Sequence, residues 1–235
     1  MAINDSSSYE RDVAAIVQKA EESLVTILDE SGTILYSSHE TLKPGKYYFL
    51  GLNPGGVNAG TDTIRQSLGN LGVLSENAYL DQDWGSNLRS TGKGCHRLQK
   101  NFKCLFEALG EDPRTVCASN LIFKRSTDAR GAGYPAMAKL CWPVHEVILR
   151  VVRPRAIIAF GVTDTFQFVT EQLGGGPVQY SKSGHGDWAW GSLIKEGAPS
   201  IIGLPHLSRY TLWTHLEVVE QIRSLLMVES SPQIL

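Results

Sequence analysis

Two asparagines and one histidine stand where apolar stretches of the chain end. Asn53 follows the run YYFLGL, Asn120 lies within TVCASNLIF, and His206 comes just after SIIGL. A carboxamide presents both hydrogen-bond donors and an acceptor, so it can match the polar edge of a nucleobase. These residue types favour recognition of a planar, hydrogen-bonding ligand over hydrolysis by a nucleophilic side chain.

Four apolar runs predict the strands that would carry these residues. Continuous apolar character is typical of strands covered on both faces, and helical patterns lie between the runs. Strands that alternate with helices favour a parallel sheet with right-handed crossovers. We therefore predict an α/β fold, a three-layer α/β/α sandwich with a central four-stranded parallel sheet. The runs occupy residues 47–52, 115–123, 155–161 and 200–204.

The carboxyl ends of parallel strands meet at one edge of a sheet, where open α/β sheets bind their ligands. The four predicted strands end in or just before Asn53, Asn120, Gly161 and His206. We expect these residues to lie along one rim and to form a single site.

The remaining segments predict one domain over residues 1–235, with an extension at residues 1–45 and a core at residues 46–227. The extension holds an amphipathic helix and a small hairpin or extended connection around a Ser-Gly turn. Two long segments show no periodicity and are predicted to be irregular. The helices are expected at residues 8–28, 95–110, 142–152, 163–174 and 210–228, the hairpin at 26–38, and the irregular segments at 58–91 and 174–192.

The composition excludes several classes of protein. Hydrophobic residues make up 42% and charged residues 20% of the 235 residues, as in ordinary globular domains. The four cysteines form no C-x-x-C pair, so no zinc or iron-sulfur site is expected. The sequence shows neither a secretory signal nor a run long enough to span a bilayer, and we expect a cytoplasmic protein without membrane contact.

The net charge of −2 gives no global attraction to phosphate, so any contact with nucleic acid must come from a local patch. The stretch RSTGKGCHRLQKNFK collects five basic side chains. A solvated helix face explains them, and so do contacts to phosphate. The five residues are Arg89, Lys93, Arg97, Lys100 and Lys103.

Two motifs resemble those of the uracil-DNA glycosylase superfamily. GLNPGGVNAG is similar to its first motif, in the Gly-x-Asn-Pro-Gly form of the mismatch-specific and single-strand-selective branches. HLSRYT, beginning at His206, resembles the second motif, which is usually His-Pro-Ser followed by a wedge residue. Asn120 falls where these families place a base-reading asparagine, and the resemblance covers residues 47–227.

The resemblance implies roles for the first motif. Asn53 would hold the attacking water beneath the sugar, and Pro54 would fix the loop. Gly55 would allow the phosphate backbone to approach closely, Leu52 and Gly55 would lie against the base, and Gly56 would contact the DNA. Asn120 would read the polar edge of the base.

The resemblance also implies roles for the second motif. His206 would stabilise negative charge on the departing base, as preorganised donors do for oxyanions. Ser208 would contact a phosphate, and Arg209 or Tyr210 would fill the gap that the flipped base leaves. The catalytic pair is therefore Asn53 and His206.

The sequence departs from the family pattern in three places. An aromatic side chain that stacks on the base is missing after the first motif, where the candidates are Ile64, Arg65, Tyr79 and Trp84. Gly55 replaces the bulky tyrosine of the most uracil-specific branch and indicates a roomier pocket. Leu207 replaces the usual proline, which loosens the expected loop.

The implied function is that of a monofunctional DNA glycosylase of base excision repair, which hydrolyses the N-glycosidic bond of uracil or another deaminated base after flipping it. No lysine nucleophile lies in either motif, and no metal or organic cofactor is expected. The partner would be DNA that contains a damaged or deaminated base, bound by a monomer.

Other interpretations remain open at this stage. Asn-Pro-Gly-Gly alone is typical of an ordinary turn. His206 could be structural, and Asn120 could be a buried amide paired with backbone. A catalytically silent nucleic-acid or nucleotide binder is the main alternative. An unrelated α/β enzyme using His206 is a third, although no G-x-S-x-G motif supports it.

Further histidines are predicted to have no part in catalysis. Gly-His-Gly-Asp around His185 and Asp187 is typical of a turn. His96, His145 and His215 lie in predicted helices and are expected to be structural.

Overall fold

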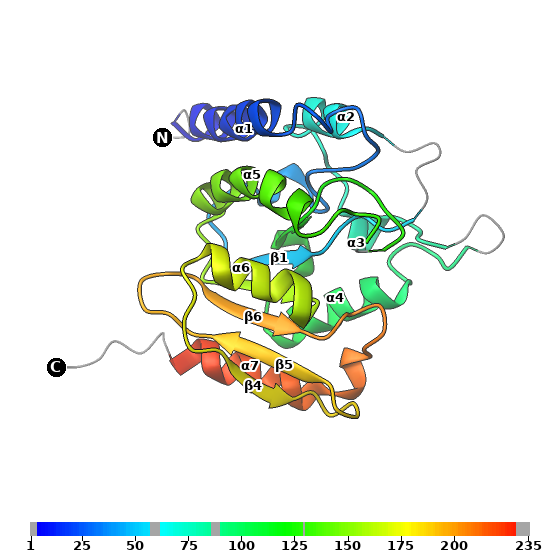
Figure 1. Ribbon diagram of the computed structural model, residues 1–235, viewed down its shortest axis with the longest axis vertical. Coiled ribbons are helices and arrows are strands. Elements are labelled where there is room, and N and C mark those ends of the chain that lie inside the picture. The colour runs from blue at the N-terminus through cyan, green and yellow to red at the C-terminus, as the bar shows by residue number, and fades with distance from the viewer. Residues whose placement is uncertain (1–3, 57–61, 86–89, 129, 229–235) are drawn as a thin grey trace. The chain divides into compact units, whose positions relative to one another are not determined.

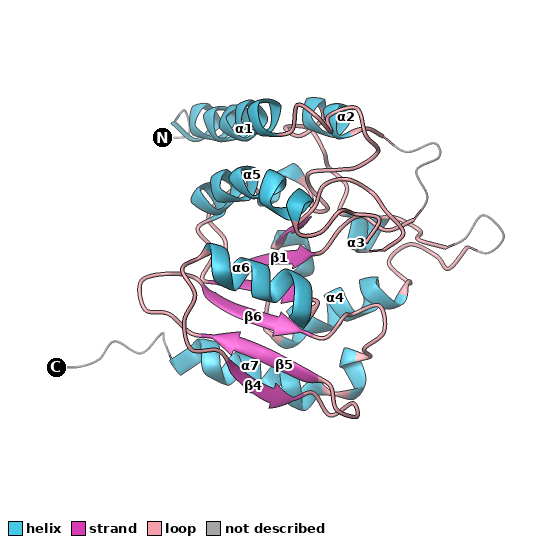
Figure 2. Ribbon diagram, in the orientation of Figure 1, coloured by secondary structure: helices cyan, strands magenta, loops and turns pink. Residues whose placement is uncertain are grey.

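The computed structural model describes residues 4–56, 62–85, 90–128 and 130–228 (Figure 1). The chain divides into two compact units, one formed by Met1–Glu76 with Cys117–Pro154 and the other by Asn77–Val116 with Arg155–Leu235. Each unit combines helices with parallel strands (Figure 2), which confirms the predicted α/β class.

The first unit is built around two parallel strands, β1 and β2. Strand β1 is buried except at its first residue, and β2 is buried throughout. Gly51 at the end of β1 lies opposite Asn120 at the end of β2. The elements of this unit are α1 (Asn4–Ser23), η1 (His39–Thr41), β1 (Tyr47–Gly51), α2 (Ile64–Gly69), β2 (Cys117–Asn120) and α5 (Ala136–Val152).

Of the hairpin or extended connection predicted at residues 26–38, the hairpin does not form, because the backbone of this segment bonds to the chain around β2 and to the start of α2 and not across a turn of its own. Tyr36 N donates to Ala118 O at 2.8 Å, and Thr33 N donates to Phe123 O at 3.1 Å. Only isolated bridges, one of them between Gly32 and Lys124, replace a ladder in this segment. The segment therefore lies alongside the strand that carries Asn120.

Helix α5 is joined to both strands through one buried histidine. Tyr48 Oη lies 2.8 Å from His145 Nδ1, and His145 Nε2 lies 3.1 Å from Leu121 O. Since the carbonyl can only accept, Nε2 carries the proton and Nδ1 accepts from the phenol. Burial lowers the pKa of His145 to about 4, so the ring is neutral at pH 7. This residue fixes the chain just after Asn120.

The second unit contains a mixed four-stranded sheet in the order β3-β6-β5-β4. Strands β3 and β6 are parallel, whereas β5 runs antiparallel to both β6 and β4. Helix α6 lies in front of this sheet and α7 behind it (Figure 1). The elements are α3 (Ala78–Asp81), α4 (Arg97–Ala108), η2 (Pro113–Thr115), β3 (Ala156–Phe160), η3 (Val162–Phe166), α6 (Gln167–Gln172), β4 (Gln179–Lys182), β5 (Ala189–Leu193), β6 (Ser200–Leu204), η4 (Leu212–Thr214) and α7 (Leu216–Val228).

The four predicted strands all form, as β1, β2, β3 and β6, but the prediction of an all-parallel sheet of four strands is wrong. The segment predicted to be irregular contains the antiparallel pair β4 and β5. Every residue of β4 is exposed, so β4 has no apolar pattern that would reveal it. Two strand glycines, Gly191 and Gly203, accommodate the ring of Phe166, which would overlap a Cβ at either position.

Candidate functional site

The loop after β1 is held beside the chain that follows β2. Leu121 N donates to Gly51 O, and Ile122 N donates to Leu52 O, both at 2.8 Å. Ser126 N then donates to Pro54 O at 3.0 Å. These bonds continue the parallel pairing past the strand ends and place Asn53 next to the segment after Phe123.

The side chain of Asn53 is fixed in one orientation. Its Nδ2 donates to Pro54 O at 2.9 Å, to Ser126 O at 3.0 Å and to Ser126 Oγ at 3.2 Å. Two of these partners are carbonyl oxygens, which can only accept, so the amide nitrogen must face them. Within the described residues Oδ1 has no hydrogen-bond partner. The half-exposed Asn53 therefore presents an oriented acceptor.

An arginine supports the glycines of this loop. A guanidinium nitrogen of Arg125 donates to Gly55 O, and Arg125 N donates to Ser31 O at 2.8 Å. Gly55 and Gly56 are exposed, and Gly56 has a φ of 94°, which favours glycine. A Cβ on Gly55 would meet no atom within 4 Å, so the space beside this residue is open.

Asn120 lies at the end of β2 and is 3% exposed. Its side chain hydrogen-bonds to the phenol of Tyr36, which also accepts a hydrogen bond from Arg125. Burial raises the pKa of Tyr36 to about 12, although Arg125 and these hydrogen bonds oppose the rise. The first unit thus joins Asn53, Asn120, Tyr36 and Arg125 around the ends of β1 and β2, and Leu52, the other residue predicted to contact a base, is buried there.

The HLSRYT loop belongs to the second unit and is clamped by a buried asparagine of α4. Asn101 Nδ2 donates to Leu207 O at 2.6 Å and to Tyr210 O at 2.7 Å. Asn101 Oδ1 accepts from Leu212 N at 2.7 Å. Leu207 is fully buried, so the residue that replaces the usual proline anchors the loop by packing.

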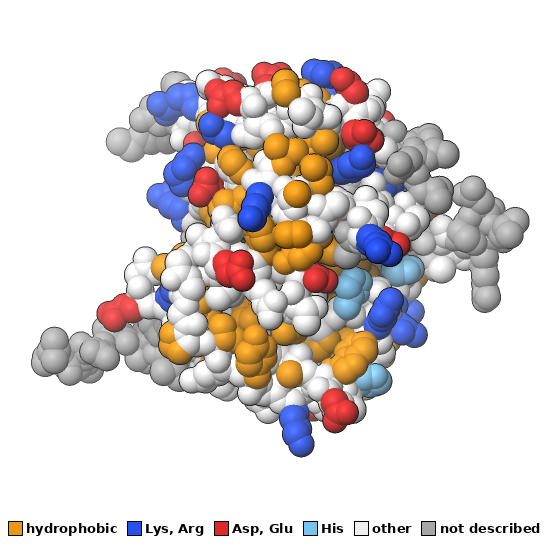
Figure 3. All heavy atoms as spheres, viewed as in Figure 1, with side chains coloured by type: hydrophobic (Ala, Val, Ile, Leu, Met, Phe, Trp, Pro, Cys, Tyr) orange, Lys and Arg blue, Asp and Glu red, His pale blue; other side chains and the backbone are white. Residues whose placement is uncertain are grey.

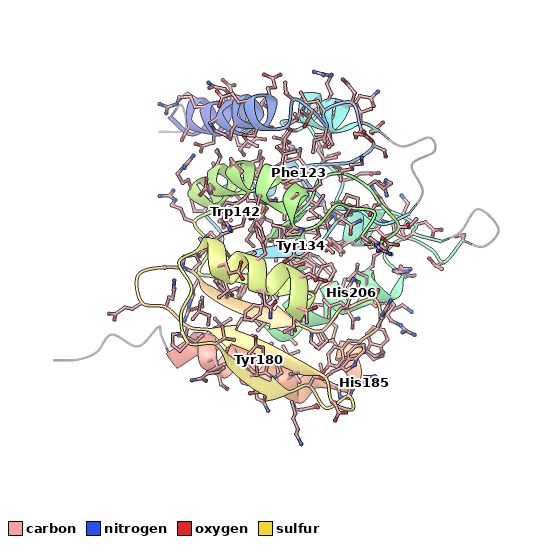
Figure 4. The ribbon with its side chains drawn as sticks, viewed as in Figure 1. Phe123, Tyr134, Trp142, Tyr180, His185 and His206 are labelled. Atoms are coloured by element: carbon pink, nitrogen blue, oxygen red, sulfur yellow. The ribbon has the colours of Figure 1, made fainter. Side chains whose placement is uncertain are left out.

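His206 lies on the loop after β6 (Figure 4) and is exposed. Its ring meets Phe160 edge-on, with centroids 5.5 Å apart. Nδ1 lies 2.8 Å from Ser208 Oγ and 3.4 Å from Ser208 N. Because the backbone N–H can only donate, Nδ1 accepts and Nε2 carries the proton of the neutral ring. His206 therefore presents an Nε2–H donor.

The environment of His206 favours this neutral form. Surrounding protein atoms lower its pKa below the ordinary value, and the positive charge of Arg209 lowers it further. The carboxylate of Asp164 opposes this shift. On the face drawn in Figure 3, histidine side chains lie beside Lys and Arg side chains, and Figure 4 labels His206 and His185 in this region.

The other residues predicted in the second motif differ in what they can do. Ser208 is half-exposed but bonds to His206 through Oγ, and Arg209 is exposed. Tyr210 is fully buried, stacks on His215 at 5.1 Å and donates its phenol to Ser183 O. The insertion role predicted for Tyr210 does not fit this burial, so Arg209 is the residue of the pair that can reach a ligand.

Most of the candidates for a base-stacking side chain are buried or paired with other residues. Ile64 is fully buried, and Tyr79 is 1% exposed and stacks on Phe102. Arg65 forms a bidentate pair with Asp29. Trp84 is half-exposed and meets Tyr79 edge-on at 5.2 Å. Trp84 is the one of the four that combines an aromatic ring with partial exposure.

Four residues that build or support the site were not predicted from the sequence. Arg125 and Ser126 come soon after an apolar run, which is the signal that identified Asn53, so they could have been found. Tyr36 reaches the site from a segment whose sequence gave no such signal. Asn101 also escaped, since its position in an amphipathic helix resembles that of an ordinary polar residue.

The basic stretch lies at the start of α4, where Lys93, Arg97 and Lys100 are exposed and Lys103 is half-exposed. Arg89 lies outside the described residues.

Among the described residues, no three His, Cys, Asp or Glu side chains gather as a metal site would require. No helix among the described residues has the length and apolar character needed to cross a membrane.

No protein-family model and no characterised protein matches this chain.

Proposed function

We propose that the protein is a monofunctional DNA glycosylase that removes uracil or another deaminated base by hydrolysis. The observation that carries this proposal is the fixed amide of Asn53, whose nitrogen bonds to Pro54 O and Ser126 and whose Oδ1 is left to accept. This arrangement suits a residue that orients a water molecule. An amide cannot take the proton of that water at ordinary pH, so Asn53 positions the nucleophile and does not act as a base.

In the proposed reaction, the bond between C1′ and the base breaks and its electron pair leaves with the base. Water bound to Asn53 Oδ1 adds to C1′ of the oxocarbenium-like sugar and releases its proton to solvent. His206 donates from Nε2–H to the oxygen of the base on which negative charge develops. Removing one such donor typically lowers kcat by about 100- to 1,000-fold.

Recognition of the base and the strand is assigned to neighbouring groups. Asn120 reads the polar edge of the flipped base, and the open space beside Gly55 accepts substituents that a bulky side chain would exclude. Gly56 allows a phosphate to approach, and Ser208 and Arg209 meet the backbone of the DNA.

The proposal requires the Asn53 loop of the first unit and the His206 loop of the second to act on one nucleotide. It includes the predicted three-layer arrangement around the parallel strands, in a cytoplasmic monomer whose partner is DNA. The two catalytic roles are separable by mutation, which makes the requirement testable.

The test is single-turnover excision from end-labelled oligonucleotides that contain uracil, hypoxanthine or xanthine, either single-stranded or mispaired. We expect alkali-labile sites with wild type and a loss of about 100-fold or more in both Asn53→Ala and His206→Ala. Asn70→Ala and His185→Ala are matched controls, because both residues are exposed and neither has a role in the reaction.

A catalytically silent binder of nucleic acid is the second candidate, and the commitment of Ile64, Arg65 and Tyr79 to other contacts favours it. It predicts that wild type binds the same oligonucleotides, that Asn120→Ala weakens binding, and that no substrate is cleaved. Cleavage by wild type that is lost in Asn53→Ala would exclude it.

A further inference from the structure

The surface formed by α4, η4 and the start of α7 carries a hollow that the proposed reaction does not use. Its volume is about 690 Å³, within the range of about 300–1,000 Å³ typical of ligand pockets. Lys100, Lys103 and Glu107 line it from α4, and Trp213 and Leu216 line it from the opposite side.

The apolar side of the hollow is exposed to solvent. Trp213 is 39% exposed and Leu216 is 47% exposed. Most large apolar side chains of the second unit are buried, so an exposed indole beside an exposed leucine stands out from its surroundings. Exposed aromatic rings are the platforms on which unpaired bases stack, irrespective of sequence.

The α4 side of the hollow is positively charged. Arg97 and Lys100 are exposed, and Lys103 is half-exposed. None of the three forms a salt bridge with another described residue. Glu107, one helical turn after Lys103, marks the end of this basic surface, and Arg97 extends it one turn before Lys100. Free cations beside an exposed ring favour an anionic, planar ligand over an apolar one.

The chain connection that carries His206 also supplies one wall of the hollow. Trp213 lies on the same connection between β6 and α7 as His206. Asn101, the residue after Lys100, clamps that connection through Leu207 O, Tyr210 O and Leu212 N. A strand that places one nucleotide at His206 can therefore continue onto α4 within the same unit.

We propose that this hollow binds single-stranded DNA, with a base stacked on Trp213 and phosphates held by Lys100 and Lys103. The proposal rests on the function proposed above for the identity of the strand, and it adds the path that the strand takes beyond the flipped nucleotide. It also gives the basic residues of α4 a role in binding phosphate, whereas a solvated helix face would have no such role.

The test measures binding of a fluorescent twelve-nucleotide oligothymidylate, which contains no excisable base, by anisotropy at several salt concentrations. Trp213→Ala should weaken binding about tenfold, since stacking of one base contributes about 1–3 kcal/mol. Lys100→Gln with Lys103→Gln should reduce the slope of log K against log salt by about 1.4, at about 0.7 for each phosphate of a single strand. This surface double variant also serves if Trp213→Ala fails to fold.

The matched controls are Trp188→Ala and Lys139→Gln with Lys182→Gln, because these residues are exposed and lie outside the hollow. They should bind as wild type does. Equal affinity and salt slope in wild type and in the hollow variants would overturn the proposal. So would binding of an acidic amphipathic Leu/Glu peptide, but not of DNA, in a manner that depends on Trp213.

Uracil excision measured in parallel separates the two proposals. If wild type excises uracil and substitution of Trp213, Lys100 and Lys103 leaves oligothymidylate binding unchanged, the strand path is refuted and the proposed reaction is not. Oligothymidylate binding that depends on these residues, in a protein that excises nothing, refutes the reaction and supports the strand path.

Discussion

Replacing Asn101 by alanine should destabilise the second unit and displace the loop that carries His206. The side chain is fully buried and makes hydrogen bonds to three backbone groups, Leu207 O, Tyr210 O and Leu212 N. Alanine leaves these groups without a partner in the protein. At about 1–3 kcal/mol for each buried group left unsatisfied, the free energy of unfolding should fall by at least about 3 kcal/mol.

A matched control lies two residues earlier on the same helix. Gln99 is also fully buried and bonds to three backbone groups, donating to Ala78 O and Gln82 O and accepting from His96 N. Gln99→Ala should therefore lower stability by a similar amount without releasing the His206 loop. The comparison separates loss of stability from loss of position.

The assay combines urea unfolding, followed by circular dichroism, with single-turnover excision at a temperature where both variants remain folded. Asn101→Ala should excise about 100-fold more slowly than Gln99→Ala, because misplacing a catalytic group by about 1 Å costs about that much. A stability loss below about 1 kcal/mol in Asn101→Ala, or equal excision rates in the two variants, would show that Asn101 does not hold the His206 loop in place.

Three further predictions follow from buried or perturbed groups. Burial lowers the pKa of His145 to about 4, so the folded state opposes protonation of this ring. The free energy of unfolding should therefore be highest above pH 6.5 and fall by about 3 kcal/mol towards pH 4, at about 1.36 kcal/mol per pKa unit, and urea titrations of His145→Gln should lack this fall. Surrounding protein atoms and the charge of Arg209 lower the pKa of His206. The rate of excision should be independent of pH above 6.5 and decline at lower pH, because a protonated Nδ1–H would face Ser208 N–H, and Arg209→Gln should move this decline to higher pH in a pH–rate profile. Gly203→Ala would push a methyl group into Phe166 and should lower the free energy of unfolding by about 1–3 kcal/mol, measured by urea titration against Gly69→Ala, where nothing lies within 4 Å.

Each of these predictions has a contrary result. Parallel pH dependences of stability in wild type and His145→Gln would show that His145 titrates normally. An unchanged profile in Arg209→Gln would remove Arg209 as a cause of the lowered pKa. Equal stability of the two glycine variants would show that Phe166 can move away from β6.

The sequence predicts the buried strands well and the exposed ones poorly. Strands β1, β2, β3 and β6 are continuous apolar runs because both of their faces are covered, so composition alone marks them. Strand β4 has no buried residue, and β5 is rich in small residues. They form because β5 pairs with β6 and β4 pairs with β5, which is a tertiary effect that local composition does not record.

Site residues were predictable where local backbone chemistry dictates their type. Asn53, Pro54 and the glycines interrupt an apolar run in a way that few structures other than a functional loop or turn require. The burial of Tyr210 was not predictable, because its phenol bonds to Ser183, which lies 27 positions away in the chain. The clamp formed by Asn101 depends likewise on a loop more than a hundred positions away.

If Asn53 directs water to a glycosidic bond, as we propose, the products of the reaction will show it. Wild-type protein is incubated with a uracil-containing single strand, and free base and intact strand are quantified by mass spectrometry before alkali treatment. We expect free uracil and an unbroken abasic strand in equal amounts, and neither with Asn53→Ala. Release of no base by folded wild type from uracil, hypoxanthine or xanthine strands, or equal release by Asn53→Ala, would contradict this proposal.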